Sequence, residues 1–143
     1  YSLTWCCKTL KNIAKGENWS LIPLYQSEML KGEGVESDKL FVRRLLKASF
    51  AGYERYSAMV AEAVSGWEKE RLFSTDVVLV VMGLAEAASF PTIPVKVTMN
   101  EYVEISKFYG TPKSRSFVNG LLDKLVQQLA NDGQINKEGK GLL

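Results

Sequence analysis

Residues 113 to 124, KSRSFVNGLLDK, combine side chains that could contact RNA within one short stretch. Lys113 and Arg115 stand where an apolar helical pattern begins. At a helix start, the unpaired backbone N–H groups and the positive end of the helix dipole favour anions such as phosphate. Phe117 could stack on a base, and Asn119 could hydrogen-bond to a base edge. Phosphate and base contacts are therefore both chemically possible here.

The same residues also fit a helix that only packs. Phe117 can be the first core residue of the helix, and Asn119 can cap a neighbouring element. Gly120 costs about 1 kcal/mol relative to Ala inside a helix, and a close contact would offset that cost. We expect Gly120 to permit close helix packing. For Phe117 and Asn119 two interpretations stay open, packing within the protein and contact with RNA.

Catalytic chemistry is poorly supported, because the chain contains no histidine. This removes the commonest general base and the commonest metal ligand. Glu101 and Glu104 have the spacing of a carboxylate metal site, but without histidine a solvated helix face is the better interpretation. Cys6 and Cys7 are interpreted as small buried residues in a reducing, intracellular setting. We predict no enzyme activity, catalytic residue, cofactor, metal site or small-molecule substrate.

The composition is that of a globular protein, with 46% hydrophobic and 24% charged residues. No apolar run reaches the roughly 18 to 20 residues of a membrane span, so no membrane contact is expected. The formal net charge of +2 is too small to indicate a polyanionic partner. An RNA surface would need local clustering, and a second basic cluster at Arg43, Arg44 and Lys47 is interpreted as a solubilising face.

Hydrophobic spacing predicts helices along the chain, and "STDVVLVVMGLAEAASF" is assigned to a buried helix rather than a strand. Gly110 is expected at the C′ position of one helix, with Thr111 as N-cap of the next. The fold class predicted is all-α, a compact bundle of about six helices. The expected helices cover residues 2–14, a short stretch from Ser20, residues 37–67 either continuous or broken near Gly52, residues 75–89, residues 95–109, and a last helix from Pro112. The expected apolar face of the long helix carries Val42, Leu46, Phe50, Tyr53, Val60, Val64 and Trp67.

The domain organisation expected is one helical domain over residues 1–132, followed by a flexible C-terminal tail over 133–143. The tail, QINKEGKGLL after "NDG", has no helical or strand periodicity. The chain opens with YSLTWCC in a helical pattern and without an initiator Met. We therefore expect a part of a longer protein.

Two consecutive segments carry a family resemblance: IPVKVTMNEYVEISKFYG and, after it, SRSFVNGLLDKL. They closely resemble the C-terminal part of proteins of the NusB family, which are bacterial transcription antitermination factors. The same three features follow in the same order: a helix that contains Asn-Glu, a Tyr-Gly pair where that helix stops, and the motif FVNG-x-LDK. The resemblance weakens upstream and covers residues 38–130. Residues 1–37 do not match the family's arginine-rich first helix. The chain is similar to the C-terminal part of a longer, N-terminally extended variant.

The resemblance implies an all-α NusB-like fold without catalysis. It also implies a cytoplasmic factor that binds boxA-type single-stranded RNA together with the ribosomal protein NusE. In the RNA polymerase antitermination complex, such a factor promotes read-through, chiefly in ribosomal RNA operons. Val81 departs from the family, which often carries an arginine there, and this lowers the implied RNA affinity. The RNA-binding positions carried over are Lys113, Arg115, Ser116, Phe117 and Asn119, and the position facing NusE is Asp76.

Two alternatives remain open at the level of sequence. NusB-like helical domains also precede the catalytic domain of RNA cytosine methyltransferases, where they bind RNA. The other alternative is a helical domain that only binds proteins, including a homodimer that would cover the RNA face.

Overall fold

The computed structural model describes residues 10–11, 14–15, 35–65 and 73–142, and for residues 35–39 only the backbone. The chain divides into two compact units, Tyr1–Lys39 and Leu40–Leu143. All the predicted site residues lie in the second unit.

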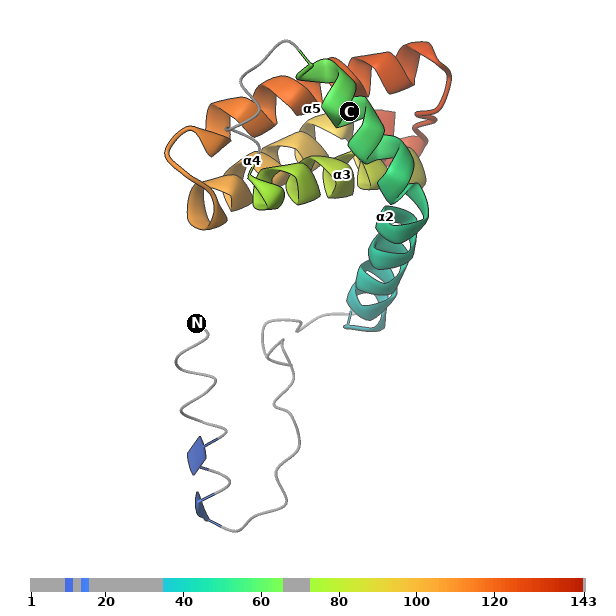
Figure 1. Cartoon of the computed structure of the whole chain (residues 1–143). Coiled ribbons are helices and arrows are strands. Elements are labelled where there is room, and N and C mark those ends of the chain that lie inside the picture. Colours follow the sequence, from blue (N-terminus) through green and yellow to red (C-terminus); the bar gives the residue numbers. More distant parts are fainter. Residues whose placement is uncertain (1–9, 12–13, 16–34, 66–72, 143) are drawn as a thin grey trace. The chain divides into compact units, whose positions relative to one another are not determined.

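The described residues form helices and no strand, so the predicted all-α class is confirmed (Figure 1). The expected number of about six helices is slightly off, since the described residues form four α-helices and one short 3₁₀ helix with described bounds, besides the helical residues 10, 11 and 14. Their bounds are α2 Val35–Ala63, α3 Ser74–Ser89, α4 Val95–Tyr109, α5 Ser114–Asn131 and η2 Gly139–Leu142.

The first two expected helices fall largely outside the described residues. In the stretch 2–14, only residues 10, 11 and 14 are described, and all three are helical. The short helix expected from Ser20, together with Cys6 and Cys7, lies entirely outside the described residues.

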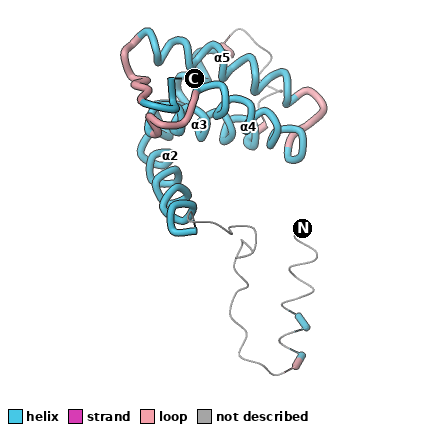
Figure 2. Tube along the Cα trace, turned by 180° about the vertical axis from the view of Figure 1, so that it is seen from behind, coloured by secondary structure: helices cyan, strands magenta, loops and turns pink. Residues whose placement is uncertain are grey.

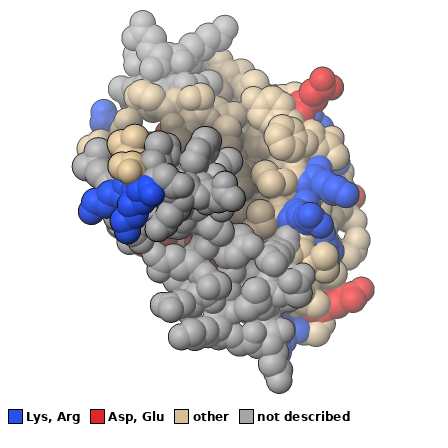
Figure 3. Space-filling view, turned by 90° about the horizontal axis from the view of Figure 1, so that it is seen from below, with Lys and Arg blue, Asp and Glu red and all other residues tan. Residues whose placement is uncertain are grey.

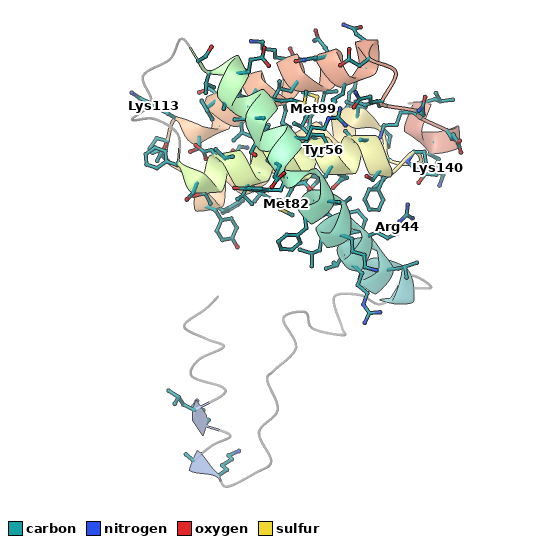
Figure 4. The ribbon with its side chains drawn as sticks, turned by 45° about the vertical axis from the view of Figure 1, so that its right-hand side comes forward. Arg44, Tyr56, Met82, Met99, Lys113 and Lys140 are labelled. Carbon is teal, nitrogen blue, oxygen red and sulfur yellow. The ribbon has the colours of Figure 1, made fainter. Side chains whose placement is uncertain are left out.

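Helices α3, α4 and α5 pack against one another, and the C-terminal half of α2 crosses them (Figure 1). Burial of apolar side chains is the main force that holds such a layer together. Tyr56 on α2 is buried, and Met99 on α4 is partly buried against the same core (both labelled in Figure 4). The side chains that are least exposed in this core include Val60, Val80, Leu84, Val118, Leu121, Leu122, Leu125 and Leu129.

Helix α3 is buried on most of its circumference, which explains its β-branched, strand-like sequence. A helix that is apolar nearly all round must lie inside a fold. Gly83 permits the close packing, because a Cβ there would lie 2.8 Å from Leu122 Cδ2 and 3.2 Å from Tyr102 Cδ2. The helix predicted over 75–89 is confirmed within one residue at its start.

The predicted apolar face of α2 is only partly correct. Val60 and Val64 are buried as expected, but four of the predicted face residues are exposed: Val42, Leu46, Phe50 and Tyr53. Leu45 and Tyr56 are buried instead. The sequence left open whether this helix is broken near Gly52, and α2 runs continuously from Val35 to Ala63. A helix contacts its neighbours over part of its length, and periodicity alone does not locate that part.

Two cations bind backbone carbonyls at the C-terminal end of α3. Arg44 donates to the Ser89 carbonyl at 3.3 Å, and its guanidinium lies 4.8 Å from the centre of the Phe90 ring. Lys137 donates to the Phe90 carbonyl at 3.0 Å. Positive charge is favourable at this end of a helix dipole. Arg43, Arg44 and Lys47 were predicted to form a solubilising face. Of these three, Arg44 also contacts the end of α3.

The segment after α5 returns to the connection between α3 and α4 (Figure 2). The Glu138 N–H donates to the Pro91 carbonyl at 2.9 Å, and Gly141 is buried against the same residue. Flexibility of residues 133–143 stays a prediction, as does the single domain over 1–132. Among the described helices, none has the length and apolar character that crossing a bilayer requires.

Candidate nucleic-acid interface

The start of α5 is set by a tight turn that follows α4. Helix α4 ends at Gly110, whose N–H donates to the Ser106 carbonyl at 2.9 Å. The Ser114 N–H donates to the Thr111 carbonyl, and the Thr111 N–H donates to Ser114 Oγ at 2.8 Å. Helix α5 therefore begins at Ser114 with Lys113 as N-cap, two residues later than predicted. Thr111 is not the N-cap, because its backbone belongs to the turn.

Gly110 ends α4 for a steric reason and not through a left-handed conformation. Its φ is −106°, which any residue can adopt. A Cβ at this position would lie 2.4 Å from Ser114 Cβ and 2.6 Å from the Ser106 carbonyl oxygen. The close approach of the two helix ends thus requires glycine.

Asp76 links the start of α3 to the start of α5. Its side chain is 2% exposed, and Oδ2 accepts a hydrogen bond from Ser114 Oγ at 2.9 Å. Within the described part of the chain, Oδ1 has no hydrogen-bond partner. Asp76 was predicted to face NusE, and in this structure its carboxylate is directed to Ser114. The contact with NusE stays a prediction.

Three of the five predicted RNA-binding residues line one groove between α4 and α5. The groove has a volume of about 660 Å³. Arg115, Ser116 and Asn119 line it from α5, and all three are exposed. The lining from α4 consists of Asn100, Val103 and Glu104. The structure therefore assembles a polar groove from residues that two separate helices contribute.

The other two predicted RNA-binding residues lie outside the groove lining. Lys113 is exposed at the outer end of the helices, and its side chain points away from them (Figure 4). Phe117 is half-buried and packs against the core, so the packing interpretation of this residue is supported. Its contact with RNA stays a prediction.

Gly120 does not serve close helix packing, which corrects the expectation from sequence. The residue is exposed, and a Cβ added to it would meet no heavy atom within 4 Å. Its neighbours in this fold therefore do not require a glycine there.

The charges around the groove are mixed. Glu104 forms an ion pair with Lys107 on the same helix, and both side chains are partly exposed. The first turn of α5 contains no acidic residue of its own, but the buried Asp76 carboxylate of α3 is hydrogen-bonded to Ser114 there and partly compensates the positive end of the α5 dipole. On the right-hand side of Figure 3, Asp and Glu side chains lie among the Lys and Arg side chains. The site is therefore identified by the polar side chains that line its groove and not by a broad basic surface.

A buried hydrogen-bond network fixes α4 against α3, and so fixes one wall of the groove. The Glu86 carboxylate accepts from Thr98 Oγ1 at 2.7 Å and from the Tyr102 hydroxyl at 2.9 Å. Burial, together with the charge and hydrogen bond of Glu86, raises the pKa of Tyr102 well above its ordinary value. Burial also lowers the pKa of Lys137, an effect that the charge of Glu86 partly opposes.

Sequence reasoning missed Asn100 and interpreted Glu104 as part of a solvated face. Their spacing of four residues places both on one side of a helix, and Arg115 and Asn119 have the same spacing. This spacing was the feature of the sequence from which Asn100 and Glu104 could have been assigned to one site. Which helix faces oppose each other is a property of tertiary packing.

Comparisons with known proteins confirm the family, but the match begins upstream of residue 38, where the resemblance was expected to begin. The sequence model of the NusB family matches residues 8–127. The "Transcription antitermination protein NusB" of Salinibacter ruber is 33% identical over 75% of this chain and 67% of its own length. The protein of the same name from Chloroherpeton thalassium is 31% identical over 73% of this chain and 50% of its own length. A third, from Alkaliphilus oremlandii, is 26% identical over 72% of this chain and 75% of its own length. No solved structure gives a significant match.

Proposed function

Because this chain belongs to the NusB family, we propose that it is an RNA-binding transcription antitermination factor. In this proposal it binds boxA-type single-stranded RNA together with NusE. It acts in the cytoplasm within the RNA polymerase antitermination complex, chiefly on ribosomal RNA operons. The observation that carries the proposal is the groove in which Arg115, Ser116 and Asn119 meet Asn100 and Glu104.

The chemistry of the α5 start supports RNA as the ligand. Lys113 and Arg115 place two positive charges at the N-terminus of α5, where phosphate is stabilised. The adjoining groove offers amide, hydroxyl, guanidinium and carboxylate groups, which together can both donate to and accept from base edges. Phe117 can offer the exposed part of its ring to a neighbouring base.

We place NusE at the start of α3. Asp76 is buried there, but Phe73 and Val78 are 48% and 43% exposed. Exposed apolar side chains beside a polar residue are typical of protein interfaces. In this proposal Phe73 and Val78 contact NusE directly, and Asp76 positions the adjoining helix starts.

The names of the matched relatives support antitermination over an RNA cytosine methyltransferase. All three are antitermination proteins. This chain spans 50% to 75% of their lengths, so the activity of the whole protein is part of the proposal.

Fluorescence anisotropy with a labelled boxA-type RNA tests the proposal. The full chain should bind with an affinity that falls as salt rises, and NusE should strengthen binding. Lys113→Glu combined with Arg115→Glu should weaken binding by at least about tenfold. It should also reduce the slope of log affinity against log salt by about 0.7 for each phosphate that the variant no longer neutralises.

The charge-matched control is Arg43→Glu combined with Lys47→Glu on α2, where both residues are exposed. This control should change affinity little. If it weakens binding while the α5 variant does not, the RNA surface lies on α2 and the proposed site is wrong.

A further inference from the structure

The groove between α4 and α5 contains a carboxylate, which is unexpected at a surface that meets a polyanion. Glu104 lines the groove opposite Arg115 and Asn119. A carboxylate only accepts hydrogen bonds, and it repels phosphate. Glu104 therefore favours RNA binding only if a hydrogen-bond donor of the RNA reaches it.

The size of the groove suits a single nucleotide. Its volume of about 660 Å³ lies within the roughly 300 to 1,000 Å³ that small-ligand sites occupy. Val103, which is 8% exposed, supplies apolar surface, and the other lining residues are polar. A small apolar surface surrounded by polar groups can contact part of an unstacked base, whose faces are apolar and whose edge is polar.

The hydrogen-bonding pattern selects the base. A carboxylate presents two neighbouring acceptors, and guanine presents two neighbouring donors, N1–H and N2–H, on its Watson–Crick edge. Cytosine and adenine offer an amino group beside an acceptor nitrogen, and uracil offers one N–H between two carbonyls. Guanine is thus the common base that can satisfy both carboxylate oxygens at once.

We propose that this groove binds one unstacked guanine of the RNA, whose N1–H and N2–H donate to Glu104. Arg115 binds the adjoining phosphate, and Asn100 and Asn119 hydrogen-bond to the remaining polar atoms of the nucleotide. The inference rests on the proposed RNA binding and adds the base that the site selects.

Lys107 makes the carboxylate compatible with a nearby phosphate. It binds Glu104 Oε1 on the same helix, and the two side chains are 35% and 54% exposed. The pair lowers the local negative charge without removing Glu104 from the groove. Exposed ion pairs of this kind contribute little to stability, so Glu104 can exchange this contact for a base.

The test is a double-mutant cycle between the protein and the RNA. The probe is a labelled boxA-type RNA in which inosine replaces one guanine at a time, because inosine lacks the N2 amino group. In the full chain, one such replacement should weaken binding about tenfold. In Glu104→Gln the same replacement should weaken binding less than about twofold, because Gln cannot accept both donors.

Glu101→Gln is the matched control. Glu101 lies on the same helix, is exposed and does not line the groove. This variant should keep the full preference for guanine over inosine. Thermal unfolding of both variants should resemble that of the parent chain, since both glutamates are exposed.

The outcomes separate this inference from the proposed function. If the RNA binds with the expected salt dependence but no inosine replacement matters, or if Glu104→Gln keeps the preference, the groove does not read guanine and RNA binding stands. If no boxA-type RNA binds, with or without NusE, both the inference and the proposed function are wrong.

Discussion

At the scale of single residues, the start of α5 depends on Ser114. This residue is 1% exposed, and its hydroxyl joins the Thr111 N–H to the Asp76 carboxylate. It is one residue away from Arg115, which lines the groove. A serine that holds two helix starts together therefore also positions the candidate interface.

Ser114→Ala should destabilise the protein by about 2 to 3 kcal/mol, because it leaves the Thr111 N–H and a buried carboxylate without this partner. Ser116→Ala is the control, since Ser116 is exposed on the same helix, and it should change stability by less than about 0.5 kcal/mol. Urea unfolding measures both values. Equal midpoints for the two variants would show that the Asp76 contact contributes nothing.

At the scale of helices, two glycines have opposite roles. Gly110 lies where α4 and α5 approach each other too closely for a Cβ, and Gly120 faces open space on α5. The sequence pattern assigned the close contact to Gly120, because glycine inside a helix is less stable than alanine and a close helix contact would offset that cost. The close contact is instead at the turn between the helices.

Gly110→Ala should cost about 1 to 3 kcal/mol, because the added Cβ forces the Ser114 side chain and the α4 backbone apart. Gly120→Ala should stabilise the protein by about 0.5 to 1 kcal/mol through helix propensity. Thermal unfolding of the two variants, which carry the same chemical change, should shift in opposite directions. A neutral Gly110→Ala would contradict the steric assignment.

At the scale of the whole described unit, a buried polar network helps to hold α3 and α4 together. Glu86 accepts hydrogen bonds from Thr98 and Tyr102, and all three side chains are buried. Buried polar groups stabilise a fold only when they are paired, so this network specifies how the two helices pack. The same packing places Asn100 and Glu104 beside α5.

The network makes stability sensitive to high pH. The pKa of Tyr102 is raised in the folded state, so above about pH 10 the unfolded chain releases a proton that the folded chain retains. The contribution of this group is complete below that pH and is lost as pH rises toward the folded pKa. Urea midpoints measured between about pH 8 and about pH 11 should therefore fall more steeply for the parent chain than for Tyr102→Phe.

Tyr109→Phe provides the control for this measurement. Tyr109 is 68% exposed on the same helix, and its substitution should leave the fall at high pH unchanged. An unchanged pH profile in Tyr102→Phe would show that the Glu86 network does not cause the fall.

The sequence alone was sufficient for the fold class, the family and most helix bounds in the described region. Hydrophobic periodicity and Gly or Pro positions are local properties, so they located α3 within one residue and the end of α4 at Gly110. The ordered motifs over residues 95–124 likewise indicated the family before any contact was known.

Tertiary structure decided which side chains meet. It buried Asp76 against Ser114, placed Glu104 opposite Asn119, and exposed Phe50 on the predicted apolar face of α2. Periodicity defines the faces of one helix, but a contact depends on how two helices cross and where each one ends. The groove exists because residues with the same four-residue spacing on α4 and α5 are brought face to face by the core beneath them.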